Sequence, residues 1–372
     1  MTGAAFRQDA RLRLLRGAGA LRRPPPLPDA PSRILIIRPD HLGDLILAAG
    51  SVAALRQAFP EARLTAWLGP WGEPVWRHHS ALDGIEVCAF PGFTRAPKPN
   101  PLAPYIQAVR AAGCLRGGFD VALNLRPDFW WGAMAACWAG IPVVGYAVAE
   151  CRPFLARAVA YTPGGHAVDE SLGLVRELAG RPIHPGAPCE LFAPASLPEG
   201  LPRGAIAIHP GAGAEVKLWD AGKWAAVARE LVNDAPVAIT AGNEGEQRMA
   251  EFIREQAGGR VQVVAGLELN ELAAFYKSCR LVLGPDNGPL HVARFVGTPT
   301  VTLFGPTDPA IFGPRSDGSD EVLRLPWRCI PCGRLDYNPA ELSYHLCVKL
   351  IEPEEVLASA RRVLVAQVSR PS

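Results

Sequence analysis

The chain has 372 residues, enough for about two domains with their own buried cores, so a small binding module is excluded. Its formal charge is +2, with 20% charged and 49% hydrophobic residues, which excludes a disordered chain and a strongly basic nucleic-acid-binding protein. Nine cysteines are too few for a disulfide scaffold, and their odd number leaves at least one thiol free. A reducing, cytoplasmic compartment is therefore expected.

Residues 1–32 are predicted to form a basic N-terminal tail that ends in a stiff proline spacer at 24–26. No unbroken apolar stretch precedes the prolines, so we expect no secretory signal peptide. Two interpretations of the tail compete. It is either a disordered or extended start, or a short amphipathic helix that lies on an anionic membrane surface.

Residues 33–187 alternate strand and helix patterns, as expected of an N-terminal Rossmann-like domain with a parallel sheet. The stretch 129–149 carries no charge for 21 residues, close to the length of a membrane span. Gly140, Pro142 and Gly145 interrupt it, so we predict a buried helix at 129–139 and a buried strand at 141–146. The other expected elements are strands at 33–38, 62–68 and 120–125 and helices at 45–59 and 109–115.

A segment rich in proline, glycine and alanine, 188–203, is a plausible linker, and 204–350 repeats the alternation as a second Rossmann-like domain. The fold class is therefore α/β, with two facing domains, parallel sheets and a cleft between them. The last segment, 351–372, contains a helix at 352–368 that is packing surface and could cross back to the first domain. The other expected elements are strands at 204–209, 236–240, 261–265, 280–284 and 300–304 and helices at 219–233, 244–256, 269–279 and 290–296.

Ligands of such sheets bind beyond the carboxyl ends of the strands, so the loops there are the candidate sites. After the first strand, Gly43 permits a tight turn and Asp44 stands at a helix start. Asp44 is either a simple N-cap or a general base. The loop lacks Gly-x-Gly-x-x-Gly, which counts against a nicotinamide or flavin dehydrogenase.

Two loops of the second half are suited to an anion. Gly211 and Gly213 let backbone N–H groups approach a phosphate, and Lys217, one of only five lysines, supplies a cation, although it could also be an ordinary surface lysine. The second loop, Gly284-Pro-Asp286-Asn287-Gly288-Pro-Leu-His291, precedes a helix whose first N–H groups suit a diphosphate. His291 either reaches that anion or packs beneath the loop.

At these loops the sequence resembles glycosyltransferase family nine, the ADP-heptose:lipopolysaccharide heptosyltransferase family of GT-B architecture. The resemblance covers about residues 33–365. The matching residues are Arg38, Leu42-Gly43-Asp44, His209-Pro-Gly211, Lys217, Trp219, Gly242-Asn-Glu, Glu246 and Asp286-Asn287-Gly288-Pro-Leu-His291. Residues 1–30 and Pro39-Asp40-His41 depart from the family pattern.

The resemblance implies an inverting transfer from a nucleotide-diphosphate sugar, held by the second domain, to a lipid-linked or oligosaccharide acceptor of the lipopolysaccharide core. Asp44 would be the general base, and Arg38 and Gly43 would lie on the acceptor side. The donor-binding set would be Gly211, Lys217, Glu246, Asp286, Asn287, Gly288 and His291. Glu246 and Asp286 would lie near donor hydroxyls, and Lys217, His291 and the helix start would stabilise the leaving diphosphate.

The chain has no Asp-x-Asp, so no cofactor is expected to be required for the chemistry. The alternatives are a GT-B-like sugar-nucleotide epimerase and a non-catalytic nucleotide-sugar-binding protein. The enzyme is expected to be cytoplasmic, with a peripheral contact at the inner membrane and no nucleic-acid partner.

A possible structural zinc site is formed by Cys329, Cys332, His345 and Cys347, whose C-x2-C and H-x-C spacing suits tetrahedral coordination. Similar cysteines occur in this region of family members. The alternative is a loop held by local packing or by one redox-sensitive pair of thiols.

Overall fold

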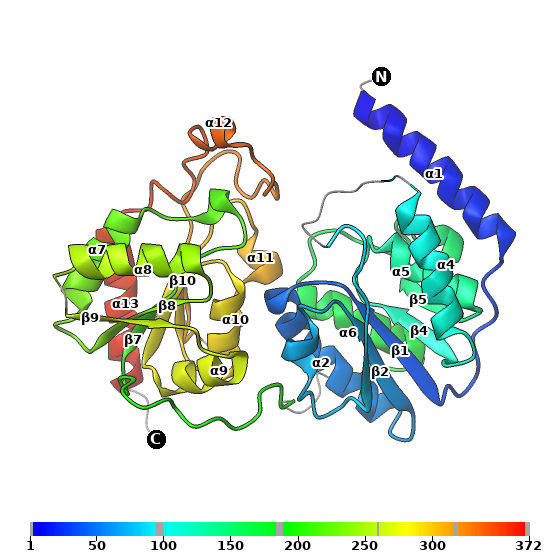
Figure 1. Cartoon of the computed structure of the whole chain (residues 1–372), viewed down its shortest axis with the longest axis horizontal. Helices are drawn as coiled ribbons and strands as arrows, with labels where there is room; N and C mark the ends of the chain where they lie inside the picture. Colours follow the sequence, from blue (N-terminus) through cyan, green and yellow to red (C-terminus); the bar gives the residue numbers. More distant parts are fainter. Residues whose placement is uncertain are drawn as a thin grey trace. The chain divides into compact units, whose positions relative to one another are not determined.

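A computed structural model describes residues 3–93, 100, 102–183, 189–258, 260–315 and 318–368, and within these ranges the side chains from residue 9 to residue 367. The chain divides into two compact units, Met1–Leu191 and Phe192–Ser372. The division falls inside the segment 188–203 that was predicted as a linker. In each unit a sheet is covered by helices (Figure 1).

The first unit is built on a six-stranded parallel sheet with the order β3-β2-β1-β4-β5-β6. The β1 strand lies at its centre because Ile34–Ile37 are apolar on both faces and fully buried. Its strands are β1 (Arg33–Arg38), β2 (Arg63–Leu68), β3 (Gly84–Val87), β4 (Val121–Asn124), β5 (Val143–Tyr146) and β6 (Arg157–Val159). Its helices after the N-terminal one are α2 (Leu42–Ala58), α3 (Glu73–Trp76), α4 (Ala103–Leu115), α5 (Trp130–Ala139), the 3-10 helix η1 (Arg152–Phe154) and α6 (Ala167–Ala179).

Helices cover both faces of this sheet. On one face, Leu35 and Ile37 pack in a core with α4 and α5 and with Trp67 and Trp131. On the other face lie α2 and α6, which pack on each other. The α3, β3, β6 and α6 elements were not among the predicted ones.

The apolar stretch 129–149 is a helix and a strand, as predicted. The α5 helix ends at Gly140, whose φ of 87° is in the left-handed region that glycine adopts without strain. The chain then turns into β5, which is buried along its length. Among the described residues no helix is long and apolar enough to cross a membrane.

The N-terminal segment is a helix, α1 (Gly3–Leu21), so the disordered or extended interpretation is wrong for these residues. It packs on its own unit. Leu15 is fully buried, Trp138 Nε1 of α5 donates a hydrogen bond to the Ala18 carbonyl (3.2 Å), and Gly19 lies against Pro153 of η1. Because tertiary contacts hold it, the helix forms despite its glycines.

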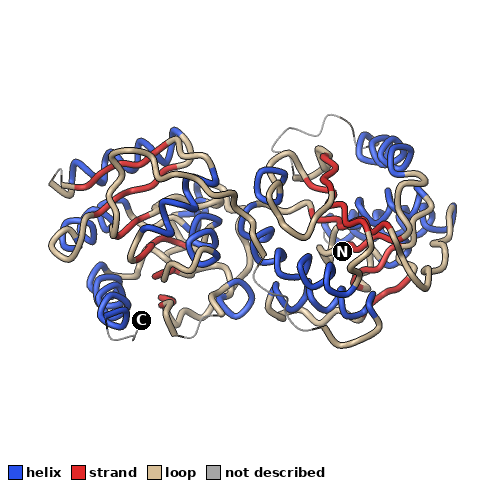
Figure 2. The backbone as a smooth tube through the Cα atoms, turned by 90° about the horizontal axis from the view of Figure 1, so that it is seen from below, coloured by secondary structure: helices blue, strands red, loops and turns tan. Residues whose placement is uncertain are grey.

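The second unit repeats the architecture with the order β12-β11-β10-β7-β8-β9, again all parallel. Figure 2 shows the strands of each unit as a red layer among blue helices. The strands are β7 (Ile206–Ile208), β8 (Val237–Ala241), β9 (Val261–Ala265), β10 (Leu281–Pro285), β11 (Thr300–Leu303) and β12 (Glu321–Leu323). The helices are the 3-10 helix η2 (Glu215–Lys217), α7 (Ala221–Leu231), α8 (Glu244–Gln256), α9 (Leu269–Ser278), α10 (Gly288–Phe295), α11 (Pro309–Phe312), α12 (Pro339–Leu342) and α13 (Pro353–Val368).

The last helix, α13, which was predicted to be packing surface, belongs to the core of this second unit. Val356, Ala360 and Val363 are buried with strands β7, β8, β10 and β11 and with α7. Trp219 Nε1 also donates a hydrogen bond to the Ile351 carbonyl (3.0 Å), which fixes the segment that leads into α13. The apolar stripe of α13 is therefore buried against the sheet of the second unit.

Candidate active site

Two strands at the centre of the second sheet create the place where loops converge. The β7 strand lies between β8 and β10, so the chain leaves it towards β8 and β9 and later returns to its other side as β10 and β11. The carboxyl ends of β7 and β10 therefore form a topological switch point, where parallel sheets bind ligands. The loops with Gly211, Lys217, Asp286 and Asn287 all start here.

Asp286 is the centre of the polar contacts at this point. It is 5% exposed and follows β10 directly. Its Oδ2 accepts hydrogen bonds from Lys217 Nζ and Thr307 Oγ1, both at 2.7 Å, and its Oδ1 lies 3.7 Å from His291 Nε2. The structure thus brings together three predicted residues, and it adds Thr307, which the sequence analysis missed.

The protonation states of this cluster follow from burial and charge. Burial alone would raise the pKa of Asp286, but the neighbouring His291 imidazole and the charge of Lys217 outweigh it and hold the pKa well below its usual range. Burial lowers the pKa of His291, against the opposing effect of Asp286. At neutral pH the cluster therefore pairs a carboxylate with the Lys217 ammonium and with a neutral imidazole.

Asn287 joins the β7 and β10 loops and starts the following helix. Its Oδ1 accepts a hydrogen bond from the Leu290 N–H (3.0 Å) and so caps α10, while its Nδ2 donates to the Gly211 carbonyl (2.7 Å). Gly284 makes the close approach possible, because a Cβ atom there would lie 2.5 Å from the His209 carbonyl oxygen. Gly288 is the first residue of α10, where N–H groups have no intrahelical partner.

Glu246 lies beside the same glycine loop. Its Oε2 accepts a hydrogen bond from the Gly242 N–H (2.7 Å) and lies 3.7 Å from His209 Nε2. A Cβ at Gly211 would meet Glu246 Oε1 at 2.4 Å, so only glycine leaves room for this carboxylate. Burial lowers the pKa of His209 to about 4, although Glu246 opposes the shift. His209 is thus neutral, and its Nδ1 is 3.0 Å from Thr240 Oγ1.

The first unit presents Asp44 at the corresponding place, after β1. The N-cap of α2 is His41, so the interpretation of Asp44 as a simple N-cap is wrong. Asp44 is half-buried in the first turn of the helix, where the dipole stabilises a carboxylate. Gly43 is also inside this helical turn rather than in a separate tight turn.

Arg38 belongs to a buried ionic cluster that the sequence analysis did not foresee. Asp40 is 2% exposed, with Oδ2 2.8 Å from Arg38 Nε and Oδ1 in contact with the Arg126 guanidinium. Arg38 also donates to the Leu125 carbonyl (2.8 Å), and Arg126 lies over the ring of Phe93. The signal was present, because Arg38 and Arg126 come at the carboxyl ends of the adjacent strands β1 and β4.

The four predicted zinc ligands do not form a ligand set. Among the described residues no group of three or more His, Cys, Asp or Glu side chains could hold a metal ion. Cys329 and Cys332 are exposed, Cys347 is buried against Gly305, and the His345 ring is 3.7 Å from that of Tyr337. The structural zinc site and its alternative, a loop held by local packing or by one redox-sensitive pair of thiols, both stay predictions.

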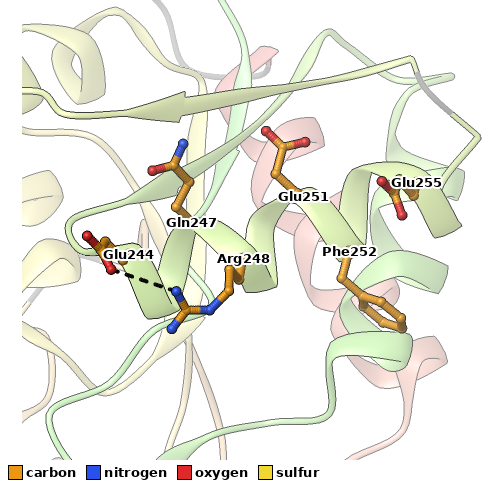
Figure 3. Close-up of a pocket in the computed structure, with 6 residues that line it drawn as sticks. All are labelled: Glu244, Gln247, Arg248, Glu251, Phe252 and Glu255. Carbon is orange, nitrogen blue, oxygen red and sulfur yellow. Dashed lines mark ion pairs between the residues drawn. The ribbon is translucent and has the colours of Figure 1, made fainter.

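A shallow hollow of about 440 Å³ on the outer side of α8 does not take part in the site (Figure 3). It is lined by successive turns of one helix, including the exposed pair Glu244–Arg248 and Phe252. Glu246, the residue of α8 that reaches the strand-end loops, is not among its lining residues. The hollow is therefore separate from the residues that meet at the strand ends.

Comparison with known proteins places these loops in a family. Residues 109–337 match the model of "Glycosyltransferase family 9 (heptosyltransferase)". The chain belongs to glycosyltransferase family 9. The matched segment contains Arg126 and all the second-unit residues Gly211, Lys217, Glu246, Asp286, Asn287, Gly288 and His291.

Individual relatives of this family 9 chain cover different lengths. Lipooligosaccharide heptosyltransferase 2 of Campylobacter jejuni is 26% identical over 43% of this chain, which spans half the length of that relative. Lipopolysaccharide heptosyltransferase 3 of Escherichia coli is 22% identical over 89% of this chain and 98% of its own length. The solved structure of E. coli ADP-heptose lipopolysaccharide heptosyltransferase II has a TM-score of 0.68, with 20% identity over 91% of this chain and all of that one. The fold is thus α/β of GT-B type.

Proposed function

We propose that this chain is an inverting glycosyltransferase that moves a heptose from an ADP-linked donor to an acceptor of the lipopolysaccharide core or a related envelope glycan. The observation that carries the proposal is the buried cluster of Lys217, Asp286 and Asn287 at the β7/β10 switch point of a family 9 chain. The donor named for the E. coli structural relative, ADP-heptose, supports the choice of nucleotide and sugar.

The second unit would hold the donor. Lys217 Nζ has three N–H donors, and its described hydrogen bonds use two, both to Asp286. The third donor, together with the first N–H groups of α10, is suited to the diphosphate. Glu246 has one oxygen committed to the Gly242 N–H and would accept a hydrogen bond from a donor hydroxyl.

The reaction would use Asp44 as its base. The acceptor oxygen attacks the anomeric carbon from the face opposite the leaving group and passes its proton to the Asp44 carboxylate. The bond from the anomeric carbon to the β-phosphate oxygen breaks, and its electron pair stays on the nucleoside diphosphate. Inversion at the anomeric carbon follows from this geometry. We propose that Lys217 and the α10 N-terminus stabilise the negative charge that develops, without a divalent cation.

The first unit would hold the acceptor near the β1/β4 switch point. Arg38 and Arg126 lie at those strand ends and share the Asp40 carboxylate. Arg126 also pairs with Asp128 (2.6 Å), so the two guanidinium groups are balanced by two carboxylates, and we propose that they contact acceptor hydroxyl groups. We place the reaction in the cytoplasm, where a nucleotide-sugar donor is available, with the acceptor presented at the inner membrane.

The decisive experiment compares transfer with donor binding. Asp44→Asn is expected to lower the rate of transfer by about 10²- to 10⁴-fold, the usual contribution of a general base, with ADP affinity by calorimetry unchanged. Lys217→Met is expected to lose ADP affinity, whereas Lys277→Met, on an exposed position of α9, keeps it. Unchanged turnover in Asp44→Asn would refute the role of the base.

Three further outcomes would count against this function or its donor. Release of free nucleotide without formation of a glycoside would indicate a sugar-nucleotide epimerase. Tighter binding of UDP or GDP than of ADP would contradict the ADP-linked donor. Binding of nucleotide with no turnover for any acceptor of the envelope class would indicate a non-catalytic binding protein.

A further inference from the structure

The two units differ in charge. Residues 1–191 carry 20 Arg and Lys against 15 Asp and Glu, a formal +5, whereas residues 192–372 carry 18 against 21, a formal −3. The excess is concentrated in two segments of the first unit. Residues 10–28 and 100–119 contain seven arginines and no acidic residue.

The first of these segments is the second half of α1 and the chain after it. Leu15 is buried with Ala108 and Ala112 of α4, and Gly19 faces Pro153 of η1. At 100° per residue, Leu14 and Leu21 fall on the opposite flank of the helix from the Gly19–Pro153 contact. They remain 63% and 84% exposed, although they are large apolar side chains.

The second segment contains α4, whose Ala108 and Ala112 share a buried core with Leu15 of α1. Its inner face is buried through Ala108, Ala112 and Leu115. Its outer face carries Leu102, just before the helix, and Ile106 and Val109, at the spacing of one helical stripe and 50–61% exposed. Arg110 and Arg116 are exposed beside this stripe.

We propose that the exposed surface of α1 and α4, defined by Leu14, Leu21, Leu102, Ile106, Val109 and the arginines Arg11, Arg110 and Arg116, binds an anionic lipid bilayer. The proposal rests on the proposed function for one point only, that the acceptor is carried by a lipid. The surface itself is argued from its side chains.

Among the anionic partners that a basic surface can bind, the side chains of this surface favour a lipid bilayer over a nucleic acid. Arginine attracts any polyanion, but a nucleic acid offers phosphates and no place for exposed leucine, isoleucine and valine side chains. A bilayer of anionic lipid takes both, with the guanidinium groups at the phosphate level and the apolar side chains at the acyl boundary. Segments 10–28 and 100–119 contain no carboxylate that would repel the lipid phosphates, and the neighbouring Asp9 is paired with Arg13 at 2.7 Å.

The test measures sedimentation of the full chain with vesicles of phosphatidylcholine alone and of phosphatidylcholine with 30% phosphatidylglycerol. The native protein is expected to bind the anionic vesicles and to be released by 0.5 M salt. The variant Arg11→Gln/Arg110→Gln is expected to bind about 25-fold more weakly, from about fivefold for each arginine. Ile106→Gln/Val109→Gln is expected to lose at least about tenfold.

A matched control uses the same substitutions on the second unit. Phe252 and Arg248 lie on the outer side of α8 (Figure 3). The exposed fraction of Phe252 is 45%, similar to the 50% of Ile106. Phe252→Gln/Arg248→Gln is expected to bind vesicles as the native protein does. Circular dichroism melting of each variant checks that it is folded, and Leu14→Ser/Leu21→Ser gives a second apolar pair if the α4 variant melts early.

Equal binding of native protein and surface variants, or equal binding to neutral and anionic vesicles, overturns the proposal. So does binding of a duplex RNA, or self-association that the surface substitutions abolish, in the absence of vesicle binding. Failure of the proposed function is distinguishable, because Asp44→Asn keeps vesicle binding. The surface variants in turn keep transfer to a water-soluble acceptor that lacks lipid.

Discussion

The ion pair between Lys217 and Asp286 allows a quantitative test of the second unit, because Asp286 is buried and Lys217 is largely shielded from solvent. Their charged atoms are 2.7 Å apart, with the two side chains 14% and 6% exposed. Removing one partner of such a pair leaves the other charge without compensation and typically costs about 3–5 kcal/mol. We therefore expect Asp286→Asn and Lys217→Met each to lower the free energy of unfolding of this unit by about that amount.

The double variant separates the pair from its surroundings. Asp286→Asn/Lys217→Met leaves no unpaired charge, so its loss is expected to be smaller than the sum of the single losses by about 2–3 kcal/mol. Thr307 donates to Asp286 as well, so part of each single loss belongs to that hydrogen bond. The double-mutant cycle removes this contribution from the coupling.

The assay is urea unfolding followed by circular dichroism and tryptophan fluorescence, fitted with one transition for each unit, because a two-domain chain need not unfold in one step. A matched control is Lys223–Glu352, an ion pair at 2.9 Å in which Glu352 is 56% exposed. Its coupling is expected below about 1 kcal/mol. Additive losses for Lys217 and Asp286, within about 0.5 kcal/mol, would refute the assignment of a buried coupled pair.

Three further predictions concern single sites. Because burial lowers the pKa of His209 to about 4, the unfolded chain takes up its proton first as the pH falls below about 6.5. Between pH 6.5 and pH 4 the free energy of unfolding of the second unit should fall by up to about 3 kcal/mol. In His209→Gln the urea midpoint should depend less on pH. Gly284→Ala should lower the free energy of unfolding by about 1–3 kcal/mol, because the new Cβ would lie 2.5 Å from a carbonyl oxygen. Gly213→Ala should lower it by less than about 1 kcal/mol, because no atom lies within contact distance of its Cβ. Asp40→Asn should lower the unfolding free energy of the first unit by about 3–5 kcal/mol, and the exposed Asp128→Asn by less than about 1.

Each of these three predictions can be contradicted separately. If the urea midpoint of the native protein depends on pH as little as that of His209→Gln, the His209 imidazole is not kept neutral by burial. Equal losses in Gly284→Ala and Gly213→Ala would contradict the close approach of the β7 and β10 loops. Equal losses in Asp40→Asn and Asp128→Asn would contradict the burial of the Arg38–Asp40–Arg126 cluster.

Periodicity and composition predicted most of the sheet strands because each is a short apolar run buried on both faces. The 33–38 run is β1 itself, and the predicted strand 236–240 overlaps β8, which is buried along its whole length. Gly140, which interrupts 129–149, was equally informative. It ends α5 in the left-handed backbone conformation, which glycine adopts without strain. Short elements at the edges, such as β3 and β6, were missed because their residues are half-exposed and carry little apolar signal.

The candidate site was predicted in part. The glycine loop with Lys217 and the Asp286–His291 motif were found because small residues after a strand, followed by a helix start, are recognisable in the sequence. The contacts of Thr307 with Asp286 and of Arg126 with Asp40 were not found. Each joins residues on different strands, and no local pattern records which side chains the sheet order makes neighbours.

The opening composition, an almost neutral charge with few lysines, thus determined less than the arrangement of those charges. The sequence by itself determined two α/β halves, the anion-binding loops and the resemblance to family 9, because these depend on local patterns of apolar and small residues. The tertiary structure alone decided that Lys217 is paired with Asp286 and that α1 packs on α5 and η1. It also decided that α13 completes the second core. The physical reason is that burial and ion pairing depend on distances between segments far apart in the chain.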